Sequence, residues 1–433
     1  MHKPPNSSFK KFALLCGGSF ITAVGSGITS FGLGVYVFQQ TGLASASALI
    51  TLLAFLPGLL LTPFAGVLAD TYDRRLLMIL GDGLSMLGII YILICMASGR
   101  AELWQIGVGV TISSIFSSLI EPSFRATVSD LLTEEEYSKA SGLVQLSGSA
   151  RFLISPLIAG LLLQVADIKL LLIIDICTIF VTVAVTFIVR RGIATKKKAP
   201  ATQSFLRDMR EGLSTLTQNK GVFALVLGSS AISFFLCCIE SLHVPMILGF
   251  TTSSVLGVAT TVCASGMLVS SLVLGIVGVK KGFTKVLSGS LFLAGVFMAG
   301  FGLRENIVLI CVFGFLFFAM LPFANMSLDY LVRTNIPNDV QGRVWGLIGI
   351  ISQLGSVLAY SILGPIADFV FTPALMPKGA LAPSIGAIIG TGSGRGIGLL
   401  IIVAGIFLCI TAVALFNIRS VRTLESGDVC TAN

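Results

Sequence analysis

Four charged side chains stand close together in one short stretch of an otherwise apolar chain. Residues 66–75 contain Asp70, Asp73, Arg74 and Arg75, whereas only 11% of the 433 residues are charged. At the centre of a membrane-spanning helix each such charge would cost about 2.5 to 3.5 kcal/mol. The stretch is therefore predicted to be a short cytoplasmic loop at a membrane surface, where its side chains can form hydrogen bonds and ion pairs.

Ionisable residues inside the apolar segments are the next candidates for chemistry, because it is costly to bury them in a membrane. We single out Glu121, Arg151, Asp175 and Glu240 as candidates for charge or proton coupling. A carboxyl group that is removed from water binds a proton more readily. Asp175 or Glu240 could therefore carry a coupling proton, and the two could face each other across a central cavity. A structural role for each carboxylate is the alternative.

Depth in the membrane ranks the possible partners of Arg151. At a rise of about 1.5 Å per residue, Arg151 lies near the midplane, Glu121 lies about 6 Å deeper, and Asp175 lies nearer the outer surface. We therefore expect Glu121 to pair with Arg151. Arg125, one helical turn from Glu121, is the alternative partner. Three further ionisable groups near the ends of spans are interpreted as structural: Asp82, Asp329 and His243.

The elements that must position these residues follow from the composition. The chain is 55% hydrophobic, with a mean hydropathy of +0.97, and carries more apolar surface than a soluble core of this size could bury. Runs of about 20 apolar residues can cross about 30 Å of hydrocarbon. Twelve such runs predict an all-α integral membrane protein: 12–37, 44–69, 76–98, 103–128, 139–165, 168–190, 221–248, 254–278, 285–303, 306–330, 345–370 and 396–416.

The distribution of Lys and Arg predicts the orientation. Most of the 28 basic residues fall in the two tails and in alternate loops, and positively charged loops stay in the cytoplasm. Both termini are therefore expected in the cytoplasm. The net charge of +8 is scattered over these loops. This scatter indicates contact with anionic lipid rather than with a nucleic acid.

The chain divides into two similar halves. Residues 1–190 are predicted to form an N-terminal six-helix bundle, and residues 221–433 a C-terminal six-helix bundle with a cytoplasmic tail. Between them, residues 191–220 form a basic cytoplasmic linker in which apolar residues at helical spacing predict an amphipathic surface helix. Two pseudo-symmetric bundles with a site between them are typical of alternating-access transporters.

Residues 66–75, together with the pattern of spans, resemble the major facilitator superfamily over essentially the whole chain. Gly66, Asp70, Arg74 and Arg75 match the signature loop that follows the second span of that family. Asp73 stands where the general pattern has glycine, and the resulting Asp-Arg-Arg is similar to the branch that contains bacterial macrolide-efflux and enterobactin-exporter proteins. The resemblance implies a major facilitator fold and a gating role for the loop.

The charges of this loop can act as a latch. Asp70 can accept hydrogen bonds from the N-terminus of a neighbouring helix, where the helix dipole favours an anion. Arg74 and Arg75 can pair with acids of the cytoplasmic surface, such as Asp130 or residues 134–136. Such contacts would exist only while the cytoplasmic side is closed. The alternative is that the charges only set the topology.

A second motif lies in the fifth span. Gly142, Pro156 and Gly160 resemble the spaced glycines and proline of exporters in this family, although Arg151 stands where a glycine is expected. Small residues let helices approach closely, and a proline lets a helix bend. The resemblance implies export of a substrate in exchange for protons, which we favour over uptake.

These observations lead to one expected function. We expect a monomeric secondary active transporter of a bacterial cytoplasmic membrane that exports an amphipathic small molecule, such as a drug, a macrolide or a siderophore. Neither a metal nor another cofactor is expected, and the sequence lacks the motifs of an enzyme. Four phenylalanines are candidates for lining the substrate cavity: Phe31, Phe116, Phe234 and Phe318. A proton- or sodium-coupled importer of a small nutrient and a non-transporting membrane receptor are the alternatives.

Overall fold

The chain is helical in the computed structural model, which describes residues 8–99, 101–133, 136–191, 213–214, 216–279, 281–336 and 341–425. Within these residues, twelve helical segments are long and apolar enough to cross a membrane. The twelve predicted spans are confirmed, with ends that differ by a few residues. The protein is therefore an all-α, multi-pass membrane protein.

The first of two compact units comprises Met1–Gly42, Leu49–Ala201 and Ser253–Val258. In it, α1 packs against α6, α7 and α8, and α3 packs against α4 and α8. Small residues permit these approaches: a Cβ atom built on Gly109 of α4 would lie 2.7 Å from the carbonyl oxygen of Gly88 of α3. The helices of this unit are α1 (Phe9–Thr41), α2 (Ala44–Thr71), α3 (Arg74–Ala97), α4 (Leu103–Ser117), α5 (Ile120–Leu131), α6 (Tyr137–Leu153), α7 (Ser155–Val165) and α8 (Ile168–Arg191).

Two spans of the first unit are interrupted. The fourth span changes from α4 to α5 at residues 118–119, and the fifth changes from α6 to α7 at Ile154. Pro156 follows this second break in the first turn of α7, where its missing N–H costs no helical hydrogen bond. The bend expected from Pro156 is therefore a break between two helices.

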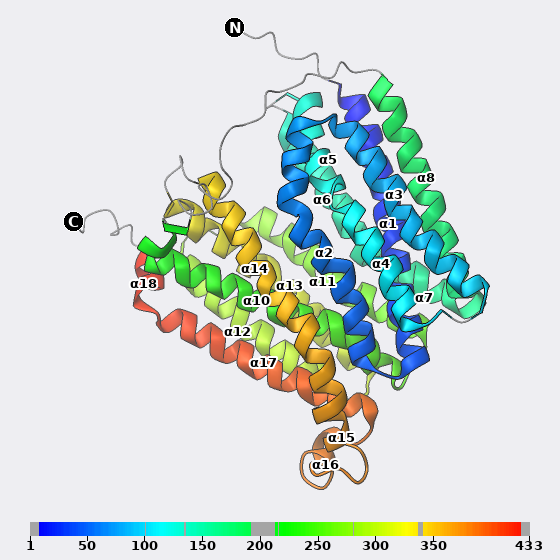
Figure 1. Ribbon diagram of the computed structural model, residues 1–433. Coiled ribbons are helices and arrows are strands. Elements are labelled where there is room, and N and C mark those ends of the chain that lie inside the picture. The colour runs from blue at the N-terminus through cyan, green and yellow to red at the C-terminus, as the bar shows by residue number, and fades with distance from the viewer. Residues whose placement is uncertain are drawn as a thin grey trace. The chain divides into compact units, whose positions relative to one another are not determined.

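The second unit comprises Leu43–Ala48, Thr202–Thr252 and Ala259–Asn433. In it, α12 packs against α13 and α17, and α10 packs against α14 and α17, an arrangement that Figure 1 shows in green, yellow and red. The elements of this unit are α10 (Lys220–Leu248), α11 (Ser253–Val277), α12 (Phe283–Phe301), α13 (Ile307–Thr334), α14 (Gln341–Ile366), the π-helix η2 (Ala367–Phe371), α15 (Thr372–Ala374), α16 (Gly386–Ile389), α17 (Ser393–Asn417), α18 (Arg419–Arg422) and η3 (Thr423–Glu425).

Two helices are divided between the compact units. The first turn of α2, within Leu43–Ala48, belongs to the second unit, and the first turn of α11, within Ser253–Val258, belongs to the first. The predicted domain boundaries stay a prediction. Most of residues 191–220, including most of the predicted amphipathic helix, lie outside the described residues.

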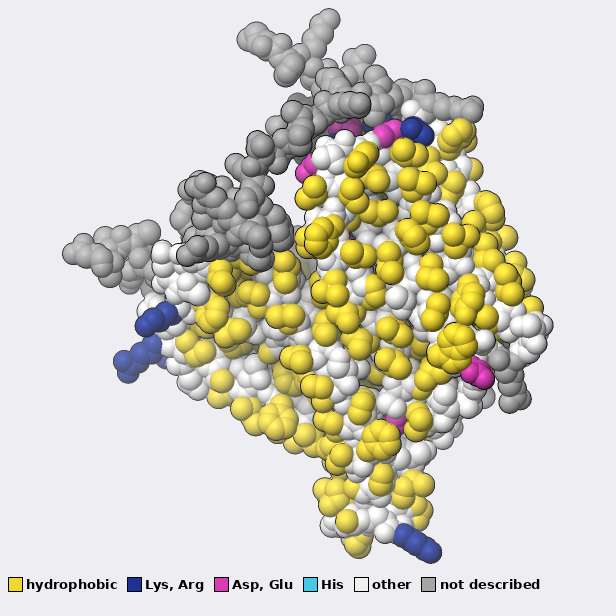
Figure 2. Space-filling model, viewed as in Figure 1, with side chains coloured by type: hydrophobic (Ala, Val, Ile, Leu, Met, Phe, Trp, Pro, Cys, Tyr) yellow, Lys and Arg dark blue, Asp and Glu magenta, His cyan; other side chains and the backbone are white. Residues whose placement is uncertain are grey.

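Apolar side chains cover the flanks of the helices. Figure 2 shows hydrophobic side chains over most of the visible face, with the visible charged side chains near helix ends and loops. Many large apolar residues on these flanks are exposed, including Phe64, Ile276 and Val308. Exposed apolar surface of this extent suits a surrounding bilayer rather than water.

Candidate gating site and buried charges

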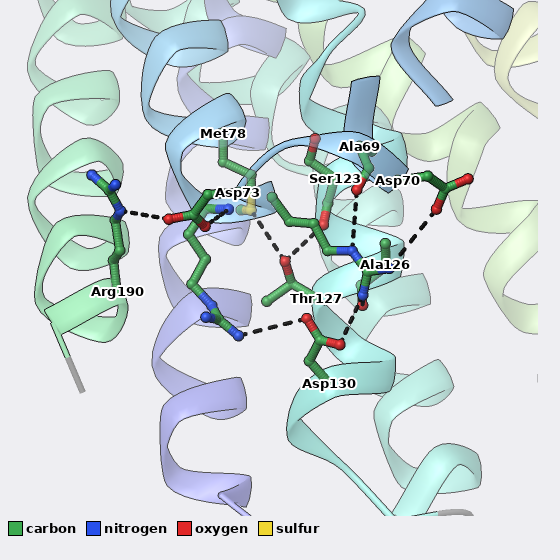
Figure 3. A network of polar contacts seen from close by, with 11 residues as sticks. Ala69, Asp70, Asp73, Met78, Ser123, Ala126, Thr127, Asp130 and Arg190 are labelled. Atoms are coloured by element: carbon green, nitrogen blue, oxygen red, sulfur yellow. Dashed lines mark hydrogen bonds and ion pairs between the residues drawn. The ribbon is translucent and has the colours of Figure 1, made fainter. Parts of the chain in front are cut away.

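The charged loop of residues 66–75 lies where α2 ends and α3 begins, beside α5 and α8 of the first unit. Figure 3 shows Asp73 directed toward Arg190 of α8, with Asp130 of α5 below it and Asp70 on the side away from Arg190. Asp73 begins α3 as its N-cap: its carboxylate accepts a hydrogen bond from the backbone N–H of Arg75 at 3.1 Å. This cap ends the loop after two residues and fixes the direction in which α3 leaves it.

Arg74 joins the end of α2 to α5. Its guanidinium donates to the carbonyl oxygens of Ala69 at 3.2 Å and Ala126 at 2.8 Å, and to the carboxylate of Asp130 at 2.8 Å. The side chain is only 16% exposed. A guanidinium suits this position because its several N–H groups can serve different acceptors at once.

Asp130 forms ion pairs with both arginines of the loop. Besides the bond from Arg74, its second carboxylate oxygen lies 3.6 Å from Nη2 of the buried Arg75. The predicted pairing of Arg74 and Arg75 with Asp130 is therefore present. Glu134 and Glu135, named as possible partners, lie outside the described residues.

Asp73 also joins the loop to the end of α8. Its second carboxylate oxygen accepts a hydrogen bond from Nε of Arg190 at 2.8 Å. The residue that departs from the general family pattern thus supplies both a helix cap and an ion pair. The sequence does not identify Arg190 as this partner, because 117 residues separate the two.

Asp70 does not make the contact expected of it. Its side chain is 67% exposed, and it forms an ion pair with Arg74 at 3.8 Å. Among the described residues no helix N-terminus donates to it. Gly66 is likewise unconstrained in this conformation, because a Cβ atom built on it meets no atom within 4 Å. The contacts predicted for Arg74 and Arg75 are therefore present, and the contact predicted for Asp70 is absent among the described residues. The gating role of the loop stays a prediction.

Two carboxylates are buried inside the first unit. Asp175 of α8 is 1% exposed and accepts a hydrogen bond from Oγ of Ser26 of α1 at 3.1 Å. Asp82 of α3 is 2% exposed, and its Oδ2 atom has no hydrogen-bond partner among the described residues. Asp82, interpreted from sequence as structural, is thus as deeply buried as Asp175.

The expected pair between Glu121 and Arg151 does not form. Glu121 pairs instead with Arg125, whose Nη2 lies 2.6 Å from its carboxylate, and both side chains are about three-quarters exposed. The Cγ atom of Arg151 lies 3.0 Å from a Cβ atom built on Gly27 of α1. The estimate compared depth alone, which does not give the direction in which a side chain points. Glu121 is 72% exposed and has Arg125 one helical turn away, so Arg125 is the partner within its reach.

Glu240 lies in the second unit with a partner of its own. The hydroxyl of Tyr360 of α14 donates to its carboxylate at 3.0 Å. His243, one turn further along α10, places Nδ1 within 3.1 Å of the backbone carbonyl oxygens of Ile239 and Glu240. The Glu240 carboxylate is thus fixed in orientation by a side chain from a neighbouring span.

Two of the three residues of the fifth-span motif, Pro156 and Gly160, contact the start of α11. A Cβ atom built on Gly160 of α7 would lie 2.7 Å from the carbonyl oxygen of Ser253 and 3.1 Å from the Cα atom of Gly257, both in the first turns of α11. Pro156 contributes its carbonyl oxygen to the same contact with Gly257. Gly142 is exposed, and a Cβ atom there meets nothing within 4 Å. Close backbone packing therefore requires Gly160 but not Gly142.

The four candidate phenylalanines are half-buried, and two of them contact the aromatic ring of the next or preceding residue. Phe234 packs edge-on against Phe235, and Phe318 against Phe317, with centroids 5.4 Å and 5.3 Å apart. Two surface crevices, one between α3 and α8 and one between α2 and α4, contain none of the four. Their role in substrate binding stays a prediction.

Asp368 was not recognised as a candidate from the sequence. Its two carboxylate oxygens accept hydrogen bonds from the backbone N–H groups of Ala44, at 3.0 Å, and Ser45, at 2.8 Å. These donors form the first turn of α2, so Asp368 caps a helix that is 323 residues away in sequence. The only feature of the sequence that could have indicated this role is a single carboxylate near the end of an apolar span.

No group of three or more potential metal ligands is found in the part of the chain that the structure describes. The ionisable residues instead form ion pairs, helix caps and buried carboxylates. Such groups can hold helices together reversibly and can bind a proton or a small cation.

Comparisons with known proteins agree with this arrangement. The chain is 27% identical over 365 residues to macrolide efflux protein A of Streptococcus pyogenes, covering 83% of this chain and 89% of that protein. It is 25% identical to YfiS, an uncharacterised transporter of Bacillus subtilis strain 168, over 90% and 94% of the two chains. A bacterial homologue of the human lysosomal transporter Spinster has the same fold, with a TM-score of 0.72, 14% identity and coverage of 98% and 99%.

A family model extends these similarities over most of the chain. Residues 15–360 match the model of the Major Facilitator Superfamily. This match includes the loop of residues 66–75, the buried carboxylates and the interrupted fourth and fifth spans. The chain is therefore a membrane transporter that belongs to the Major Facilitator Superfamily.

Proposed function

We propose that this transporter exports amphipathic small molecules, with macrolides as the first class to test, in exchange for protons. The observation that carries the proposal of export is the similarity to macrolide efflux protein A along most of both chains. The contact of Gly160 and Pro156 with the start of α11 gives residues of the exporter-like motif a place in the packing.

The buried cluster around Asp175 supports coupling to a cation. Asp175 and Asp82 are almost completely buried, and an unpaired charge in such a place is costly. A proton bound by Asp175 would remove that cost, and its release would leave a carboxylate that attracts Arg151. Proton binding would thereby change the packing of α8 against α1. Glu240, oriented by Tyr360, is the candidate for the same role in the second unit.

The loop of residues 66–75 is proposed as the gate of the cytoplasmic side. In this proposal both termini are cytoplasmic, the membrane is the bacterial cytoplasmic membrane, and the transporter works as a monomer by alternating access. Arg74, Arg75 and Asp130 hold α2, α3 and α5 together. The exposed Asp70 is the part of the gate that engages when the cytoplasmic side closes.

Drug accumulation in cells tests the direction of transport. The protein is expressed in a macrolide-sensitive bacterium that lacks its own efflux pumps. Uptake of labelled macrolides, other lipophilic drugs and siderophores is then compared with that in cells expressing the Asp70→Asn variant at equal membrane abundance. Export predicts that the native protein lowers steady-state accumulation of at least one compound several-fold.

Two other outcomes would contradict the proposal of export. Higher accumulation with the native protein than with Asp70→Asn would establish import and contradict the proposal. Equal accumulation of every compound, with binding still detectable on the purified protein, would support a receptor instead of a transporter.

A further inference from the structure

Asp368 caps the start of α2 from a distant part of the chain. The first N–H groups of a helix have no partner within the helix, and the residues just before α2, Gly42 and Leu43, carry no side-chain acceptor. Asp368 supplies acceptors for two of these groups, with one carboxylate oxygen for each of the N–H groups of Ala44 and Ser45.

The approach of α14 to this turn is built into the backbone. A Cβ atom on Gly364 would lie 2.6 Å from the Cα atom of Ser45 and 3.0 Å from the Cβ atom of Ala48. Ala44 and Ala48 are at most 1% exposed. This contact requires glycine on α14 and small residues on α2. Close packing of the two helices therefore brings the Asp368 carboxylate to the start of α2.

An irregular helical segment determines the direction of the Asp368 carboxylate. Pro365 lies at the end of α14, and the π-helix Ala367–Phe371 follows at once. A proline removes a helical hydrogen bond, and a π-helix widens the turn and rotates the residues within it. Such segments persist where they serve a specific position, and here the segment contains Asp368.

We propose that Asp368 is a positioning residue of the transport cycle that clamps the start of α2 whenever the outer side is closed. Leu43–Ala48 belongs to the second unit, whereas the rest of α2 belongs to the first. Opening the outer side requires the Asp368 carboxylate to release Ala44 and Ser45, and water then hydrates both partners. The clamp at this end and the Asp70 contact at the other end of α2 exclude each other. This inference rests on the proposed alternating-access function.

Hydrogen–deuterium exchange of the purified full-length protein tests the clamp without any substrate. The amides of Ala44 and Ser45 have no acceptor within α2, so their protection depends on Asp368. In Asp368→Asn the negative charge and one of the two acceptors are lost, and exchange in residues 44–46 is expected to rise about tenfold. Asp167→Asn, which alters an exposed acid in the loop before α8, serves as the matched control.

The opposite end of α2 decides between a clamp and a simple helix cap. A clamp that takes part in the cycle predicts that Asp368→Asn also slows exchange in residues 66–75, because that end closes more often, and that Asp368→Glu partly restores both changes. Faster exchange in residues 44–46 with no change in residues 66–75 would make Asp368 a local cap and overturn the proposal. Unchanged exchange in residues 44–46 would overturn it as well. Neither reading depends on the identity of the substrate, the coupling ion or the direction of transport.

Discussion

The two ends of α2 are held by different chemistry. At its start, one distant carboxylate, Asp368, binds two backbone N–H groups. At its end, Arg74 binds the carbonyl oxygen of Ala69 and joins it to α5, while Asp70 remains two-thirds exposed. The contact predicted for Asp70, a carboxylate on a helix N-terminus, thus exists in the molecule, but at the opposite end of the same helix and with a different acid.

This difference suggests how one rigid helix can serve two gates. A carboxylate on a helix N-terminus forms charge-assisted hydrogen bonds. Because these bonds all end on one side chain, they can break and re-form together. The guanidinium network around Arg74 spreads its bonds over α2 and α5 and is harder to dissolve. In the proposed cycle, the Arg74 network stays intact while Asp70 and Asp368 form their contacts in turn.

Removing the guanidinium at the end of α2 should give the largest effect. Arg74→Met leaves the Asp130 carboxylate and the carbonyl oxygens of Ala69 and Ala126 without this donor, and hydrogen bonds to charged groups are each worth about 1.5 to 3 kcal/mol. Transport in vesicles is expected to fall more than about tenfold at equal abundance. Arg304→Met, at an exposed loop position, should leave it unchanged. Retention of half the native rate in Arg74→Met would show that the network is dispensable.

The start of α11 is a helix end that close backbone packing, rather than a charged side chain, holds in place. Gly160→Val places a branched side chain where even a Cβ atom would lie 2.7 Å from the carbonyl oxygen of Ser253. Since backbone atoms cannot yield cheaply, we expect transport to fall about fivefold or more and stability to drop by about 1 to 3 kcal/mol. Gly148→Val, in the same span but with open space around it, is the control. Equal effects of the two changes would refute the packing role.

Neutralising the two acids at the ends of α2 should affect thermal stability unequally. In the conformation described, Asp368→Asn weakens two hydrogen bonds and should lower the apparent melting temperature in detergent by about 2 to 4 °C. Asp70→Asn weakens only an exposed pair at 3.8 Å and should leave it within about 1 °C. The opposite ranking would mean that the purified protein rests with the Asp70 end engaged.

The smallest effect is expected where the loop departs from the family pattern. Asp73→Gly restores the general pattern but removes the cap of α3, which costs about a few tenths of a kcal/mol with glycine. It also removes the ion pair with the partly exposed Arg190, worth about 1 kcal/mol or less. We expect transport to fall less than about threefold. Asp73→Asn keeps an acceptor for the cap, so measuring both variants in the same vesicle assay separates the cap from the ion pair. A loss as large as that of Arg74→Met would place Asp73 at the centre of the gate.

The span pattern and the family could be predicted from the sequence, because apolar length and loop charge are local properties. The pairing of Arg74 and Arg75 with Asp130 was also predictable, since few acids lie near that surface. The partner of Glu121 was not, because depth along a span does not give the direction of a side chain, and Arg125 lies one helical turn away. Asp368 escaped notice because its partners are backbone N–H groups, which leave no trace in side-chain types.

Proton movement in liposomes tests the proposed function most directly. The purified protein is reconstituted with an internal pH dye in sodium-free buffer, and the panel of macrolides, lipophilic drugs and siderophores is applied under an imposed proton gradient. The account predicts substrate-dependent proton movement that is lost in Asp175→Asn, with substrate binding retained. Substrate transport without proton movement, or proton movement that Asp175→Asn and Glu240→Gln both leave intact, would contradict it.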